Sequence, residues 1–204
     1  MSDAALAALQ PRGNEILDQI RGTFAEKGFD GASMQDLARA AGMSVGNFYR
    51  YFPSKAALVE AIILRDMDLV RADFEDVLAA PDPMARLREV LHRRIKVETC
   101  KADPSLWAEI TAMAHRRPEV AAICIQMEAE IIRLLIGVIA RVRGLALPEA
   151  EARFGAHAGL IVLLVKSWAL EDPGKLAATS GLEALLLKTI ERTLDEIASA
   201  CPKG

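Results

Sequence analysis

The sequence has few aromatic residues, few cysteines and no long hydrophobic run, and each shortage excludes a class of protein. Aromatic residues make up 5% of the 204 positions, so a core would be built mainly from aliphatic side chains. The three cysteines, Cys100, Cys124 and Cys201, are far apart and form no CxxC pair, which argues against a disulfide framework and a zinc finger. The longest apolar run covers eight residues, 158–165, whereas a membrane span needs about twenty. The first residues lack a signal-peptide pattern, and we expect a cytoplasmic protein without a membrane partner.

A large excess of basic residues and the short motifs of enzymes are also missing. The formal net charge is −3, which argues against a protein that coats nucleic acid non-specifically but leaves room for a local DNA-reading surface. We find no nucleophile elbow, no phosphate-binding loop and no pair of histidines at metal-ligand spacing. We therefore expect no enzymatic activity, no metal and no cofactor. The alternatives are a helical adaptor that binds other proteins and a helical enzyme.

Helical signals dominate what is present. Hydrophobic residues make up 52% of the chain, no segment alternates apolar and polar residues as a strand would, and proline and glycine fall between apolar-periodic segments. The pattern predicts an all-α protein with helices over residues 12–27, 33–41, 44–52, 55–78, 83–101, 104–115, 118–143, 148–171 and 181–200. We expect an N-terminal three-helix domain over 1–56 and a larger helical domain over 57–204, with the helix over 55–78 connecting the two.

The most informative stretch covers residues 33–62 and reads as two short helices joined by a sharp turn. Ser33 with Asp36 forms a capping-box pattern, and Ser44 is placed to cap the second helix. Phe48 and Phe52 lie four residues apart and share one face, which predicts that they help to close a small core. Helices this short are unstable alone in water and need that shared core.

A different face of the second helix is left outward, and it carries an unusual glycine. Val45, Gly46 and Tyr49 lie on this face, with Asn47 and Arg50 at its margins. A glycine inside a helix costs about 1 kcal/mol relative to alanine. Gly46 is understandable where the helix backbone must come close to another surface.

Residues 33–62 resemble the DNA-binding signature of the TetR family. The matching positions occur in order and without a gap: Leu37-Ala38, Ala41-Gly42, Ser44, Gly46, Tyr49, Tyr51-Phe52 and Lys55. The resemblance implies a helix-turn-helix whose second helix enters the major groove, with Val45, Gly46 and Tyr49 against bases and Gln35 reaching in from the preceding helix. It also implies phosphate contacts for Ser44, Asn47, Tyr51 and Lys55. Ser33, Arg50 and Arg39 are further candidates near the same surface.

The charge of this segment sets an expectation for its DNA affinity. Between Arg12 and Lys55 there are six cations and five acids, a balance of +1. DNA binding would therefore depend on a few well-positioned contacts and on a dimer that presents the reading helix twice. We predict a modest salt dependence for one protomer.

The C-terminal helices suggest a dimer interface and an effector pocket. The helices over 148–171 and 181–200 carry apolar stripes that fit either a four-helix bundle between two protomers or the core of one protomer. The interface candidates are Leu160, Leu164, Leu182, Leu186, Ile190 and Leu194. A Met or Trp at helical spacing is more often plain core than a ligand contact. With that alternative favoured, the candidates for lining an effector pocket are Trp107, Ile110, Thr111, Met113, Cys124, Met127 and Trp168. With the resemblance, these features predict a homodimeric repressor that a small-molecule effector releases from a palindromic operator on double-stranded DNA.

Overall fold

The computed structural model describes residues 11–96, 104–171 and 181–200, and every regular element within these ranges is a helix. The all-α prediction is therefore confirmed. Cys100, Cys201 and the predicted helical residues 97–101 lie outside the described ranges. No described helix is both long enough and apolar enough to cross a membrane.

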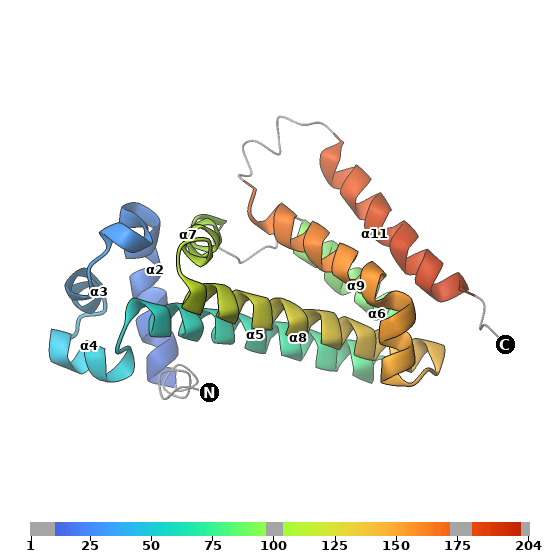
Figure 1. Ribbon diagram of the computed structural model, residues 1–204, viewed down its shortest axis with the longest axis horizontal. Helices are drawn as coiled ribbons and strands as arrows, with labels where there is room; N and C mark the ends of the chain where they lie inside the picture. Colours follow the sequence, from blue (N-terminus) through green and yellow to red (C-terminus); the bar gives the residue numbers. More distant parts are fainter. Residues whose placement is uncertain (1–10, 97–103, 172–180, 201–204) are drawn as a thin grey trace. The chain divides into compact units, whose positions relative to one another are not determined.

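The helices follow the predicted order closely (Figure 1). The N-terminal helices are α2 (Pro11–Gly31), α3 (Met34–Ala40), α4 (Val45–Tyr51) and α5 (Lys55–Ala79). The later helices are α6 (Pro83–Ile95), α7 (Pro104–Ala114), α8 (Pro118–Arg143), α9 (Leu147–Ala169) and α11 (Leu182–Ser199). One difference concerns α2, which we expected to end at Gly28. Gly28 adopts φ 67°, which kinks the helix, but helical structure resumes after it.

The chain packs into two compact units. The first comprises Met1–Leu69 with Ser105–Met127, and the second comprises Val70–Pro104 with Glu128–Gly204. Since α7 and the start of α8 pack with the N-terminal helices, the packing units do not coincide with the predicted division near residue 56. That division concerns function and stays a prediction.

The core of the first unit contains the N-terminal aromatic residues. Phe24 and Phe29 stack with their ring centroids 4.6 Å apart, and Phe48 and Phe52 form a tilted pair at 5.4 Å. All four side chains are fully buried. This packing explains how α3 and α4, of seven residues each, are held in place.

The core of the second unit is mainly aliphatic. It brings together α6, α9 and α11, whose mutual packing is visible in Figure 1, with the adjoining parts of α5 and α8. Trp168 is its one buried tryptophan among the described residues, and the indole Nε1 donates a hydrogen bond to the carbonyl oxygen of Ile95 at 2.6 Å.

Candidate nucleic-acid interface

Two serine caps fix the start of α3 and of α4. Ser33 Oγ accepts a hydrogen bond from the Asp36 backbone N–H at 3.1 Å, and Asp36 Oδ2 accepts one from the Ser33 backbone N–H at 3.0 Å. Ser44 Oγ accepts from the Asn47 backbone N–H at 3.3 Å. The predicted capping box and the predicted second cap are therefore both present, and they set where each short helix begins.

The turn between the two helices depends on Gly42. Its φ of 63° lies in the left-handed region, which glycine adopts without a steric penalty. This conformation lets the Met43 backbone N–H donate to the carbonyl oxygen of Ala38 at 2.9 Å. The bond closes the end of α3 and redirects the chain into α4.

The outward face of α4 is the one predicted from the spacing. Val45 is 37% exposed and Tyr49 is 45% exposed, while Phe48 between them is fully buried. The remaining residues of the predicted DNA-binding set on this helix and its cap are exposed or half-buried, and Gln35 and Ser33 on α3 are exposed. The DNA-binding candidates Ser33, Gln35, Ser44, Val45, Gly46, Asn47, Tyr49, Arg50 and Tyr51 thus lie on two consecutive short helices and their caps.

Gly46 has no structural reason within the chain to be glycine. Its backbone is helical, and a Cβ built on it meets no described atom within 4 Å. An alanine would fit there and would favour the helix by about 1 kcal/mol. The absence of a side chain therefore suits contact with something outside the chain.

Most cations of the first four helices already have acidic partners. Arg21 pairs with Asp66 at 3.1 Å and Lys27 pairs with Asp36 at 2.9 Å. Hydrogen bonds from Ser33, and next from Lys27, hold the pKa of Asp36 well below its usual range. Arg50 makes no ion pair with another described residue, and its guanidinium lies 5.8 Å from the ring centroid of Tyr51.

Comparison with known proteins identifies this arrangement. Residues 16–62 match the family described as "Bacterial regulatory proteins, tetR family". The HTH-type transcriptional regulator UidR of Escherichia coli K12 is 34% identical over 124 residues, which cover 60% of this chain and 61% of UidR. Salmonella enterica GusR, a solved structure, has 26% identity and a TM-score of 0.67, with 91% of this chain and 96% of GusR covered. Residues 16–62 of the chain are therefore similar to the TetR family.

Two further comparisons set the limits of the similarity. RutR of Escherichia coli K12 is 31% identical over 97 residues, which cover 48% of this chain and 45% of RutR. The chain thus matches less than two thirds of the length of either curated relative. FadR from Bacillus subtilis in complex with stearoyl-CoA shares the fold, with a TM-score of 0.60, 18% identity, and 93% of this chain and 100% of FadR covered. UidR and RutR are both named HTH-type transcriptional regulators.

Lys55 has a structural contact that the spacing did not predict. Its Nζ donates to the carbonyl oxygen of Phe29 at 2.6 Å and lies 5.7 Å from the centroid of the Phe29 ring. The Phe29 backbone N–H donates to Glu109 Oε2 on α7 at 3.0 Å. A phosphate contact by Lys55 would therefore either accompany this hydrogen bond or replace it.

Glu109 is a functional candidate that sequence reasoning missed. Its Oε2 would lie 3.3 Å from a Cβ at Gly28, so glycine serves both the positive φ and the close approach of this carboxylate. The only available signal was that Glu109 is the single charged residue of the apolar helix α7. Asp66 was missed in the same way: burial raises its pKa, opposed by Arg21, Arg65 and a hydrogen bond from Trp107.

The effector candidates divide between the two compact units. Trp107, Ile110, Thr111, Met113, Cys124 and Met127 all belong to the first unit, where Ile110 and Met113 are buried and the others are half-buried. Trp168 belongs to the second unit, where its indole is bonded to the backbone of Ile95. The six of the first unit stay predictions as ligand contacts.

The dimer candidates need a correction. Ile190 and Leu194 are fully buried in the core of the second unit, so they have no surface to offer a partner, and their packing against their own chain explains the stripe on α11. Leu164 and Leu186 are partly buried against the same core. Leu160 and Leu182 are exposed, and their neighbours Leu163 and Leu185 are more exposed, at 58% and 60%.

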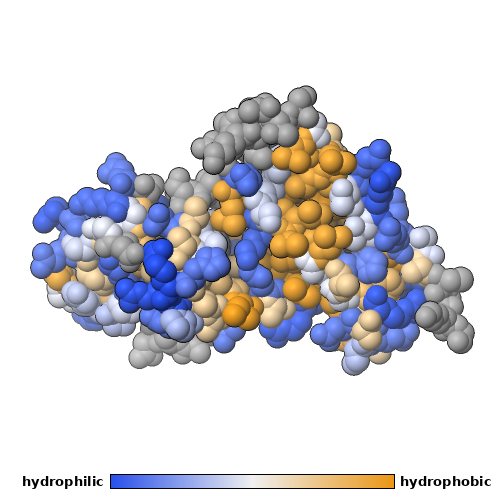
Figure 2. All heavy atoms as spheres, turned by 45° about the horizontal axis from the view of Figure 1, so that its top comes forward, coloured by the Kyte–Doolittle hydropathy of each residue, from blue (hydrophilic) through white to orange (hydrophobic). Residues whose placement is uncertain are grey.

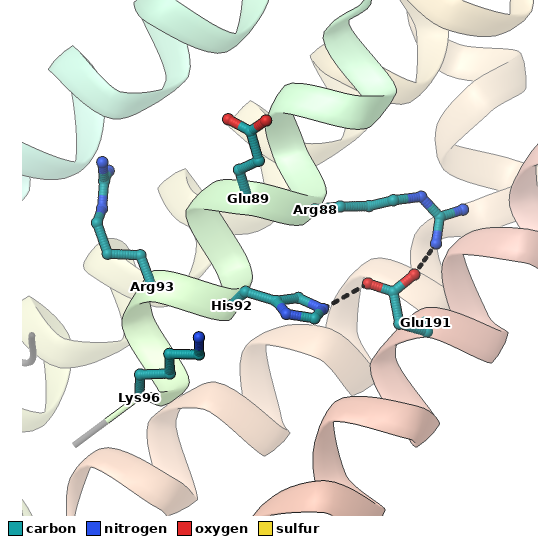
Figure 3. Close-up of a pocket in the computed structure, with 6 residues that line it drawn as sticks. All are labelled: Arg88, Glu89, His92, Arg93, Lys96 and Glu191. Carbon is teal, nitrogen blue, oxygen red and sulfur yellow. Dashed lines mark hydrogen bonds and ion pairs between the residues drawn. The ribbon is translucent and has the colours of Figure 1, made fainter. Parts of the chain in front are cut away.

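A cleft of about 440 Å³ lies on the second unit, between α6 and α11 (Figure 3). His92 Nε2 lies 2.7 Å from Glu191 Oε1, and Arg88 bonds to Glu191 and to Asp195. Arg93, on another side of α6, pairs with Asp73 at 2.5 Å. Because these cations are paired with acids of the chain, the cluster ties α6 to α11 and α5 rather than offering unbalanced charge to a ligand.

Proposed function

We propose that this chain is a sequence-specific DNA-binding transcriptional regulator of the TetR type that places α4 in the major groove. The observation that carries the proposal is the exposed face of α4, where Val45 and Tyr49 stand outward on either side of a glycine that the chain itself does not require. Val45 would contact thymine methyl groups, and Gly46 would let the helix backbone approach the base edges. Gln35 could read adenine from α3, with Ser44 and Asn47 at the phosphates.

The regulator would bind its operator as a homodimer. A single short reading helix contacts few base pairs, and dimers of helix-turn-helix proteins read two half-sites. Figure 2 shows hydrophobic side chains gathered over α9 and α11, where Leu160, Leu163, Leu182 and Leu185 are exposed. Contiguous exposed apolar surface of this kind marks an interaction site. It supports an isologous interface of α9 and α11 on a palindromic operator.

A small-molecule effector would release the repressor. FadR from Bacillus subtilis, which shares the fold, is solved with stearoyl-CoA, so this architecture accommodates a ligand. An effector can shift the protein toward a form that does not fit the operator only if it binds that form more tightly. The pocket residues we propose are those of α7 and α8 in the first unit, including Trp107, Thr111 and Met127.

The test begins with selection of bound sequences from random DNA, which would reveal the half-site and its spacing. Fluorescence anisotropy then compares the wild type with Tyr49→Ala on the selected duplex. We expect affinity to fall by about tenfold or more, equivalent to 1.4 kcal/mol. Leu69→Ala, an exposed apolar residue on α5, is the control and should bind like the wild type.

Lys55 is unsuitable for this test because its ammonium also holds the Phe29 carbonyl oxygen, so its loss would mix folding with binding. Tyr49→Ala should leave the thermal unfolding midpoint unchanged. Undiminished operator binding by a folded Tyr49→Ala variant would contradict the proposed docking of α4.

A further inference from the structure

A second cavity lies within the first unit, away from the exposed face of α4. Its volume is about 490 Å³, inside the range of roughly 300–1,000 Å³ common for small-molecule sites. Three parts of the chain form its wall: the end of α2 at Phe29, the start of α5 at Ser54–Ala56, and the joint between α7 and α8. All of these parts belong to the same compact unit.

The lining combines an apolar floor with cations. Phe29, Met113 and Val120 line the cavity as apolar residues and are almost completely buried within the chain. Lys55 and Arg117 supply two cations, against one acid, Glu119. In the cleft of Figure 3, by comparison, Arg88 and Arg93 are bonded to carboxylates of the chain.

Arg117 is the residue that most needs explanation. It is exposed, it lines the cavity, and it makes no ion pair with another residue in the described part of the chain. Its backbone is well anchored, because the N–H donates to the carbonyl oxygen of Met113 at 2.8 Å. A guanidinium held at the rim of an apolar cavity is suited to a planar carboxylate, which it can bind through two parallel hydrogen bonds.

We propose that this cavity binds an aryl carboxylate, with the carboxylate between Arg117 and Lys55 and the ring over Phe29, Met113 and Val120. The size admits a fused two-ring ligand, and the Ser54 hydroxyl is a further donor in the lining. The site is separate from the outward face of α4 and from the residues proposed above to contact DNA, except for Lys55.

Occupation of the cavity would act on the DNA-reading helices through Phe29. The Phe29 peptide is held from both sides, its N–H by Glu109 and its carbonyl oxygen by Lys55, and its ring stacks on Phe24 in the core. A carboxylate beside Lys55 would draw the ammonium away from the Phe29 carbonyl oxygen and loosen this support. With this support loosened, the ligand would weaken operator binding. Because coupling free energies are reciprocal, the operator would weaken ligand binding by the same factor. This last step rests on the proposed function.

The site itself is tested without DNA, by isothermal titration calorimetry of the full chain with 2-naphthoate and its neutral isostere 2-naphthamide. We expect the wild type to bind the carboxylate about tenfold or more tightly than the amide. Arg117→Gln should remove that preference, while Arg116→Gln, a neighbouring exposed arginine outside the lining, should keep it. Ala56→Leu, which fills the cavity, should weaken both ligands. Equal binding of the two ligands by the wild type, or full naphthoate affinity in a folded Arg117→Gln variant, would overturn the proposal.

The coupling is tested separately on the selected operator. Saturating 2-naphthoate should reduce the operator affinity of the wild type and of Arg116→Gln, but not that of Arg117→Gln. Unchanged operator affinity in the presence of bound naphthoate would overturn the coupling. If the chain bound no DNA at all, the proposed function would fail, while the calorimetric comparison would still decide the site.

Discussion

At the scale of single residues, a substitution at Gly46 should affect folding stability and DNA affinity differently. Because a Cβ at this position meets open space and the backbone is helical, Gly46→Ala should leave stability unchanged or raise it by up to about 1 kcal/mol. The added methyl would stand between α4 and the bases, so operator affinity should fall by about tenfold. Urea unfolding and fluorescence anisotropy measure the two effects.

Gly22→Ala is the matched control, since Gly22 is also helical, exposed and surrounded by open space, but lies on α2. It should gain similar stability and bind DNA like the wild type. Equal DNA affinities for the two alanine variants would mean that α4 does not approach the bases closely at Gly46.

The lowered pKa of Asp36 should make the free energy of unfolding depend on pH. Hydrogen bonds from Ser33 and Lys27 lower its pKa below the ordinary value of 3.8, so the folded state binds its proton less readily than the unfolded state does. The stabilisation is therefore complete above that ordinary value and is lost as the pH falls below it toward the lowered pKa. Urea unfolding between pH 7 and 3 should show the difference between wild type and Asp36→Asn shrinking at the acidic end. A constant difference would contradict this assignment.

At the scale of helices, the starts of most helices were predictable, and the end of α2 was not. Caps and prolines are local signals, and α3, α4, α6, α7 and α8 begin within one residue of the predicted position because Ser33, Ser44, Pro83, Pro104 and Pro118 stand there. The sequence predicts a helix end at Gly28, because nothing local indicates that helical structure resumes after it. The signal is tertiary: the carboxylate of Glu109, which lies 81 positions further along the sequence, approaches Gly28 and accepts a hydrogen bond from the Phe29 N–H.

For Trp168, too, local sequence signals could not reveal the tertiary contact that the side chain makes. From spacing alone a tryptophan on α9 is more often part of a core than of a ligand pocket, and the bond to the Ile95 carbonyl oxygen supports a place in the core. Trp168→Phe would leave that buried acceptor without a donor, which costs about 1–3 kcal/mol. We expect a lower urea midpoint with unchanged operator half-site preference. An unchanged midpoint would show that the indole hydrogen bond contributes nothing to stability.

At the scale of the whole molecule, the sequence predicted which face of α4 points outward, but not how the leucines of α9 and α11 divide between core and surface. A stripe with three- and four-residue spacing is the same in both cases. Burial assigns Ile190 and Leu194 to the core and leaves Leu163 and Leu185 exposed. Leu163→Glu should therefore convert a dimer to a monomer in sedimentation velocity without unfolding it, whereas Ile190→Glu should unfold the chain. A dimeric Leu163→Glu variant would move the interface elsewhere.

The salt dependence of operator binding is also a property of the whole molecule, because it counts the phosphates that the protein neutralises. The slope of log K against log salt is about −0.9 for each phosphate contacted by a cation. In the described part of the N-terminal helices, Arg21, Lys27 and Arg39 already face Asp66 or Asp36, and Lys55 is bonded to Phe29. Arg50 is then the main cation left for phosphates on each protomer.

For a wild-type dimer we expect a slope of about −2 to −4, measured by fluorescence anisotropy between 50 and 200 mM salt. For Arg50→Gln the slope should be shallower by about 2, because each protomer loses one phosphate contact. A wild-type slope near −10, typical of a strongly basic binder, would mean that these ion pairs open on DNA and that the affinity comes from charge rather than from the face of α4.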